Sequence, residues 1–294
     1  MSSIFPSFEP EHDAHENVRR KRFRLIPIRM LIPNMITLLA LCMGLTAIRM
    51  GIEGRYELAI ASIVVAAVLD SLDGRVARML KSTSRFGAEL DSLADFLNFG
   101  VAPAVLLYNW ALKDLRSVGW IGVLCFSIAM ALRLARFNVA LDRPKPSWQA
   151  NFFVGMPAPA GALTVMLPLY ISSLNIIPIR DLAPLILVYV LAVAFFVIST
   201  MPTYSGKAIG QRVPREAVLP ILFGVLVYSA FLLSYPWETL TLSTFAYIGS
   251  LPLSFLRYRA LERRFGKILD QAPQPVNPAT AETGKGEQPG SNLH

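Results

Sequence analysis

The sequence predicts an all-α fold: a polytopic transmembrane helical bundle of about eight spans with both termini in the cytosol. Of the 294 residues, 54% are hydrophobic and only 16% are charged, whereas a soluble domain would carry about a quarter charged residues. The apolar residues form long blocks near the 20 residues that cross a bilayer. They lack the alternation of a membrane β-barrel. The distribution of Lys and Arg then sets the orientation.

Eight apolar blocks are the expected spans, because helices and closed barrels are the only structures that satisfy the backbone in lipid. Their approximate bounds are 31–50, 57–72, 93–112, 117–138, 157–176, 182–200, 216–234 and 239–256. The second block is short before its acidic end. An even number of spans returns the chain to the side on which it began.

Positive charge is concentrated on one side of this arrangement. With the N-terminus inside, the cytosolic segments hold 23 of the 28 Lys and Arg residues, as the positive-inside rule requires. We therefore expect an integral protein of a bacterial inner membrane, with its chemistry facing the cytosol. The net charge of +8 suggests contact of residues 18–24 and 257–267 with anionic lipid headgroups. A nucleic-acid partner is not expected, because no soluble basic domain is present.

The ends of the chain differ from the apolar blocks. Residues 1–30 form a polar N-terminus followed by a basic segment suited to a juxtamembrane helix. Residues 259–294 begin basic and continue rich in Pro, Gly and polar residues, which favours a disordered tail. The membrane domain is expected over 31–258.

Four carboxylates lie beside the second and third blocks at helical spacing. Residues at i, i+3, i+4 and i+7 share one face of a helix. The first such stripe holds Asp70, Asp73, Gly74 and Ala77. The second holds Gly87, Asp91 and Asp95. Two helices that meet along these stripes would bring four carboxylates together.

Four bare carboxylates at close range cannot all stay ionised, and divalent cations remove that difficulty. All-oxygen ligation suits Mg²⁺ or Mn²⁺, and four Asp residues fit two ions, which commonly serve phosphoryl displacement. Gly74, Ala77 and Gly87 would leave room for a bulky ligand, and Arg78 is placed to meet a phosphate. Solvated loop acids and small-residue helix packing are the alternative explanations.

The spacing Asp70-x₂-Asp73-Gly74-x₂-Ala77-Arg78-x₈-Gly87-x₃-Asp91-x₃-Asp95 resembles the signature of the CDP-alcohol phosphotransferases. The resemblance implies displacement at the β-phosphorus of a CDP-linked alcohol with release of CMP, and a catalytic core over about 31–200. It implies two metal ions on Asp70, Asp73, Asp91 and Asp95, with Asp95 also the general base. It implies homodimers as well. The CDP-binding residues it implies are Asn34, Gly74, Ala77, Arg78, Ser84 and Gly87, Asn34 belonging to a Pro33-Asn34 element.

The segments 133–138 and 151–161 look like those of the integral-membrane phosphatidylserine synthases. That resemblance implies CDP-diacylglycerol as donor, L-serine as acceptor, and phosphatidylserine and CMP as products. We expect acceptor-binding residues at Arg133, Arg136 and Asn138. By charge, the two arginines suit either the carboxylate of serine or the phosphate of another acceptor.

Other functions are left open by the residues. The same donor with glycerol 3-phosphate or choline is the nearest alternative. A secondary transporter also uses intramembrane carboxylates and broken helices. Transport is disfavoured because the Asp motif occurs once, with no counterpart in the second half of the chain. A structural scaffold would have no use for the acidic cluster.

Overall fold

The computed structural model describes residues 28–141, 152–175, 178–199, 202–204 and 215–270. These residues are helical except for a short two-stranded ribbon, so the prediction of a helical fold is confirmed. The expected N-terminal surface helix lies almost entirely outside the described residues. Residues 259–270, the first part of the expected C-terminal tail, are helical, and the rest of the tail lies outside the described residues.

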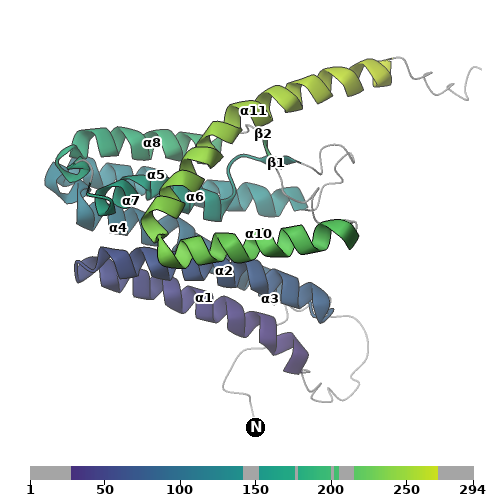
Figure 1. Cartoon of the computed structure of the whole chain (residues 1–294), viewed down its shortest axis with the longest axis horizontal. Coiled ribbons are helices and arrows are strands. Elements are labelled where there is room, and N and C mark those ends of the chain that lie inside the picture. The colour runs from purple at the N-terminus through teal and green to yellow at the C-terminus, as the bar shows by residue number, and fades with distance from the viewer. Residues whose placement is uncertain (1–27, 142–151, 176–177, 200–201, 205–214, 271–294) are drawn as a thin grey trace, which may run out of the picture.

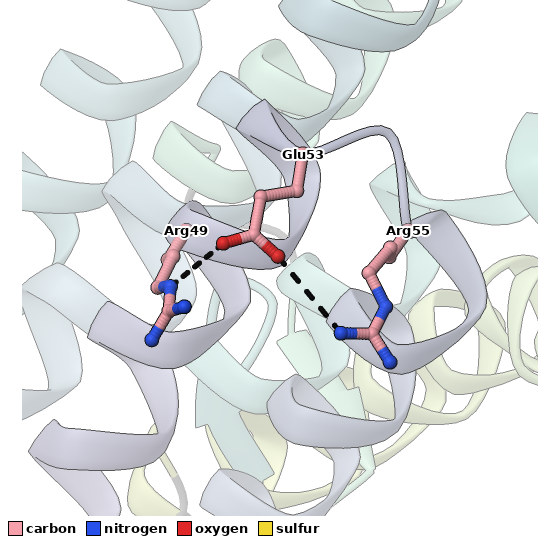
Figure 2. Close-up of polar contacts among 3 residues, drawn as sticks. All are labelled: Arg49, Glu53 and Arg55. Atoms are coloured by element: carbon pink, nitrogen blue, oxygen red, sulfur yellow. Dashed lines mark hydrogen bonds and ion pairs between the residues drawn. The ribbon is translucent and has the colours of Figure 1, made fainter.

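Two long helices form one side of the bundle (Figure 1). Helix α1 spans Ile28–Ile52 and α2 spans Tyr56–Met79, and the two pack side by side along their length. The reversal between them is at Gly54, whose φ of +76° is available to glycine at no steric cost. Glu53 in this turn contacts Arg49 at 2.8 Å and Arg55 at 3.9 Å (Figure 2). All three side chains are well exposed, so these pairs contribute little to stability.

The next span is a continuous helix with a wide turn inside it. Helix α3 spans Arg85–Asp95, a π-helical turn η1 spans Phe96–Val101, and α4 spans Ala102–Trp110. A π-turn leaves backbone groups poorly paired, and Ser127 Oγ donates to the carbonyl of Gly100 at 3.1 Å. On its other side, η1 packs against Gly44, where any Cβ would collide with Asn98 Oδ1.

The remaining helices close the bundle. After a 3₁₀ turn η2 (Leu112–Leu115), helix α5 spans Arg116–Leu141 and supplies the central core residues Phe126 and Met130. Two short helices follow, α6 (Ala158–Val165) and α7 (Leu167–Ser173). They are separate because Pro168 stands at the start of α7 and cannot donate to the preceding turn. A 3₁₀ turn η4 (Ile179–Asp181) then leads into α8, Ala183–Ile198.

A two-stranded antiparallel ribbon pairs two separate segments of this half of the chain. Strand β1 (Phe152–Val154) pairs with β2 (Pro202–Tyr204), with Phe153 opposite Thr203. Sequence patterning did not predict these three-residue strands. Helices α10 (Arg215–Ser234) and α11 (Pro236–Asp270) complete the described chain, and α11 crosses the front of the bundle obliquely (Figure 1).

Five helices in the described part of the chain are long and apolar enough to cross a membrane. They are Leu31–Ile52, Arg85–Trp110, Leu112–Ala140, Glu216–Ser234 and Pro236–Arg257. The described residues of the predicted blocks 57–72, 157–176 and 182–200 are also largely helical, but these helices do not meet those measures of length and composition. Helix α2 carries charges, 157–176 is divided at Met166, and α8 has only 16 residues.

Candidate functional site

The structure gathers carboxylates where α2 meets α3. Asp70, Asp91 and Asp95 each offer one carboxylate oxygen, and these oxygens all lie within 4.8 Å of one another. Asp73 lies within electrostatic range of Asp70 and Asp91 but is held separately. Its Oδ2 accepts a hydrogen bond of 2.7 Å from Thr37 Oγ1 on α1. The sequence spacing predicted the convergence of four carboxylates; the structure groups three of them, and Asp73 lies beside these.

This cluster fits a divalent cation. Asp70 and Asp95 each have a carboxylate oxygen within 4.8 Å of the other, although ionised carboxylates only accept hydrogen bonds. Asp95 Oδ1 is buried and has no hydrogen-bond partner among the described residues. A buried carboxylate oxygen without a partner is costly. A hard cation that takes oxygen ligands would pair with this oxygen and offset the repulsion between the carboxylates.

A cavity of about 150 Å³ opens beside the cluster, between α1, α2 and the α2–α3 loop. It is lined by Pro33, Asn34, Thr37, Asp73, Gly74, Ala77, Arg78, Ser82, Thr83, Ser84, Gly87, Ala88 and Asp91. All six residues predicted to bind CDP are in this lining. We call it the nucleotide cavity.

Of the two glycines that line the nucleotide cavity, Gly87 has the closer neighbouring side chains. A Cβ there would lie 2.9 Å from Asn34 Oδ1 and 3.1 Å from Ser84 Oγ, closer than ordinary contact. Ser84 caps α3, since its Oγ accepts a 3.0 Å hydrogen bond from the Gly87 amide. A Cβ at Gly74 would meet only Arg78 Nη1 at 3.6 Å, an ordinary distance. The steric requirement for glycine is therefore stronger at Gly87 than at Gly74.

The three predicted acceptor residues on α5 have different surroundings. Arg133 is 9% exposed and lies within electrostatic range of Asp95 and Asp70. Arg136 donates to the carbonyl oxygens of Ile198 at 2.7 Å and Ser199 at 3.2 Å, at the end of α8. Asn138 Nδ2 donates to Ser92 Oγ at 2.9 Å, next to Asp91 in the chain. The structure thus brings Arg133 toward the carboxylates, and gives Arg136 and Asn138 contacts that join helices.

Residues 30–198, more than half of the chain, match the family model described as CDP-alcohol phosphatidyltransferase. This chain belongs to that family. Residues 216–252 match a second model, described as CDP-alcohol phosphatidyltransferase 2. The three Asp residues of the cluster, Asp73 beside them and the entire nucleotide cavity fall within the first match.

Several curated relatives of this family member carry the name CDP-diacylglycerol–serine O-phosphatidyltransferase. The protein of that name from Mycobacterium leprae is 51% identical over 148 residues, 50% of this chain and 49% of its own. The one from Helicobacter pylori 26695 is 38% identical over 137 residues, covering 47% and 56%. The one from Bacillus subtilis 168 is 40% identical over 137 residues, covering 46% and 74%. The chain thus spans about half the length of the mycobacterial relatives it matches.

Four residues in the lining of the nucleotide cavity were not predicted from the sequence. They are Thr37, Ser82, Thr83 and Ala88. Thr37 follows Pro33 by one helical turn, so the Pro33-Asn34 element carried a signal for it. Ser82 and Thr83 lie in the loop Leu80–Ser84, where no periodicity indicates which side chains face inward. A site with clustered carboxylates, an adjoining cavity whose lining includes hydroxyl, amide and guanidinium groups, and a nearby arginine can bind a phosphorylated ligand and accept a proton.

Proposed function

We propose that this protein transfers the phosphatidyl group of CDP-diacylglycerol to L-serine, giving phosphatidylserine and CMP. The observation that carries this proposal is the carboxylate cluster adjoining the nucleotide cavity, in a chain whose relatives are named for this reaction. CDP-diacylglycerol would place its cytidine diphosphate in that cavity, against Asn34 and the α3 N-terminus. Arg78 would meet the phosphates.

Asp70, Asp73, Asp91 and Asp95 would hold two divalent cations, Mg²⁺ or Mn²⁺. When bound, these cations neutralise the diphosphate and the charge that develops on its oxygens.

The reacting groups follow from the positions of the side chains. Asp95 would accept the proton of the serine hydroxyl, because its Oδ1 is buried with no competing donor among the described residues. The serine oxygen then forms a bond to the β-phosphorus, the bond from that phosphorus to the CMP oxygen breaks, and CMP leaves. Arg133 would hold the serine carboxylate close to Asp95.

The same proposal places the enzyme in a bacterial inner membrane, with the site and both termini on the cytosolic side. Eight spans would result if α2, the α6–α7 pair and α8 cross the bilayer together with the five long apolar helices. Residues 31–258 would form the membrane domain, with the catalytic core at 31–200. We propose a homodimer on the basis of the family, to be tested by cross-linking in native membranes.

The first experiment is CMP release by the purified full chain in detergent, with CDP-diacylglycerol and Mn²⁺ or Mg²⁺. Serine, glycerol 3-phosphate, choline and inositol phosphate are supplied in turn. Release that depends on serine alone, and is absent in Asp91→Ala, supports the proposal. CMP release with another acceptor would keep the family assignment but reject serine as the acceptor. No CMP release with any acceptor, in protein shown to be folded, would favour the transporter hypothesis.

A further inference from the structure

Tyr247 on α11 has a buried polar atom that the mechanism has not used. Its hydroxyl has no hydrogen-bond partner among the described residues, and the same holds for Arg133 Nε. Buried polar atoms are nearly always paired. Two such atoms from different helices therefore need an explanation.

Arg133 connects Tyr247 to the carboxylate cluster. Its guanidinium lies within electrostatic range of Asp95 and also of Tyr247. Arg133 itself is more than nine-tenths buried. Tyr170 also has a buried hydroxyl without a partner in the described part of the chain, but the titratable groups that influence it are the tyrosines Tyr189 and Tyr228. The electrostatic interaction with Arg133 distinguishes Tyr247.

Helix α11 presents Tyr247 to the bundle through its helical pattern. Leu240 and Thr244 are buried at 6% and 5% exposure, and Ser254 at 3%. Tyr247 shares their face, three residues after Thr244 and seven before Ser254. Leu242 and Phe245, on the opposite face, are 72% and 53% exposed. The orientation of Tyr247 is thus set by the same face that packs α11 onto the protein.

The Arg133 guanidinium and the Tyr247 hydroxyl have unused hydrogen-bond donors and could together bind a small anion. Arginine binds a carboxylate strongly through charge-assisted hydrogen bonds, and a tyrosine hydroxyl adds a neutral donor. We infer that Tyr247 is an acceptor-binding residue, whose hydroxyl donates to the serine carboxylate held by Arg133. This inference rests on the proposed function, and it assigns part of the acceptor site to a helix beyond the 30–198 family match.

The test compares Tyr247→Phe with the wild-type chain and with Tyr228→Phe. The control removes a hydroxyl from α10 that contacts Ser243 Oγ at 3.1 Å on the exposed surface. CMP release is measured against serine and against CDP-diacylglycerol. We expect Tyr247→Phe to raise the KM for serine roughly tenfold, since the hydrogen bond it removes goes to a charged group. The KM for CDP-diacylglycerol and the melting temperature should not change, and Tyr228→Phe should match the wild type.

Serinamide separates recognition of the carboxylate from a packing effect, because it keeps the hydroxyl and amine of serine but lacks the carboxylate. As substrate or competitive inhibitor, it should act on Tyr247→Phe as it acts on the wild type. An unchanged KM for serine, or an equal loss with serinamide, would overturn the inference while the serine reaction stands. Failure of the proposed function would be visible in the wild type alone, as CMP release with an acceptor other than serine. That result would also reject the contact between Tyr247 and the serine carboxylate.

Discussion

Thr37 Oγ1 donates a 2.7 Å hydrogen bond to Asp73 Oδ2, joining α1 to α2 at the floor of the nucleotide cavity. Both side chains are 5% exposed. The Pro33 carbonyl lies 3.1 Å from the same hydroxyl, so Thr37 is fixed from two sides. The contact occupies one oxygen of Asp73 and orients the other, which explains why Asp73 stands slightly apart from Asp70, Asp91 and Asp95.

We expect Thr37→Val to lower kcat/KM for CDP-diacylglycerol about tenfold or more, because a hydrogen bond to a charged group contributes roughly 1.5–3 kcal/mol. Valine has nearly the same shape, so the fold should be retained. Thr37→Ser keeps the hydroxyl and should stay close to wild type. Steady-state CMP release measures both variants. Equal activity in the valine and serine variants would show that the hydroxyl does not support Asp73.

Gly87→Ala should weaken donor binding without unfolding the protein. The new Cβ would lie 2.9 Å from Asn34 Oδ1, so the Asn34 side chain must move out of its position in the nucleotide cavity. Alanine otherwise favours the helix. We expect the KM for CDP-diacylglycerol to rise about tenfold, the cost of roughly one hydrogen bond.

The matched control for Gly87→Ala is Gly224→Ala on α10, where a Cβ meets nothing within 4 Å. It should leave the kinetics unchanged. A Gly87→Ala enzyme with a normal KM would mean that Asn34 does not contact the donor.

Asp95→Asn should abolish turnover while leaving nucleotide binding largely intact, because the amide cannot accept the serine proton and the cavity lining is unchanged. CMP release and CDP-diacylglycerol binding, measured separately, distinguish these two effects. Glu89→Gln on the same helix removes an exposed acid and should remain active. Near-normal turnover in Asp95→Asn would remove Asp95 as the base.

Arg136→Ala should lower the melting temperature, because it removes two hydrogen bonds to the carbonyls that end α8. A loss of roughly 1–3 kcal/mol is expected. The exposed Arg180→Ala is the control for loss of a positive charge. Thermal unfolding in detergent measures the effect. Full stability together with a raised KM for serine would instead support Arg136 as an acceptor-binding residue.

Chelation should stop CMP release reversibly and leave the helical bundle folded. The carboxylate cluster sits between α2 and α3, and the apolar core around Phe126 and Met130 does not depend on it. Treatment with EDTA, followed by circular dichroism and by re-addition of Mn²⁺ or Mg²⁺, checks both parts. Undiminished activity after exhaustive chelation would contradict the assignment of Asp70, Asp91 and Asp95 as metal ligands.

The parts predicted from sequence are those set by local periodicity. Helical spacing placed Asp70 and Asp73 on one face of α2 and Asp91 and Asp95 on one face of α3. The CDP-binding residues implied by the family resemblance all line one cavity. Contacts between distant segments were not predictable in this way. Thr37 meets Asp73 across 36 residues, and Arg136 meets Ile198 across 62.

The division of block 157–176 at Met166 and the β1–β2 ribbon were also missed. Hydropathy over a long window does not register a single proline or strands of three residues.

The π-turn η1 has a consequence for how this span tolerates change in length. A regular α-helix turns by about 100° per residue, and the wider π-turn takes up one extra residue with little added rotation. The hydrophobic pattern of the sequence therefore shifts by one position between α3 and α4, while their faces stay aligned in space. Deleting one residue within Phe96–Val101 would leave a regular helix in which Leu106 and Trp110 still face the core. Loss of one residue here is thus a local event, whereas in a regular helix such as α5 it would rotate every contact on one side by about 100°. The turn is a place where this span can change its length by one residue and still keep its reactive end aligned with its packing end.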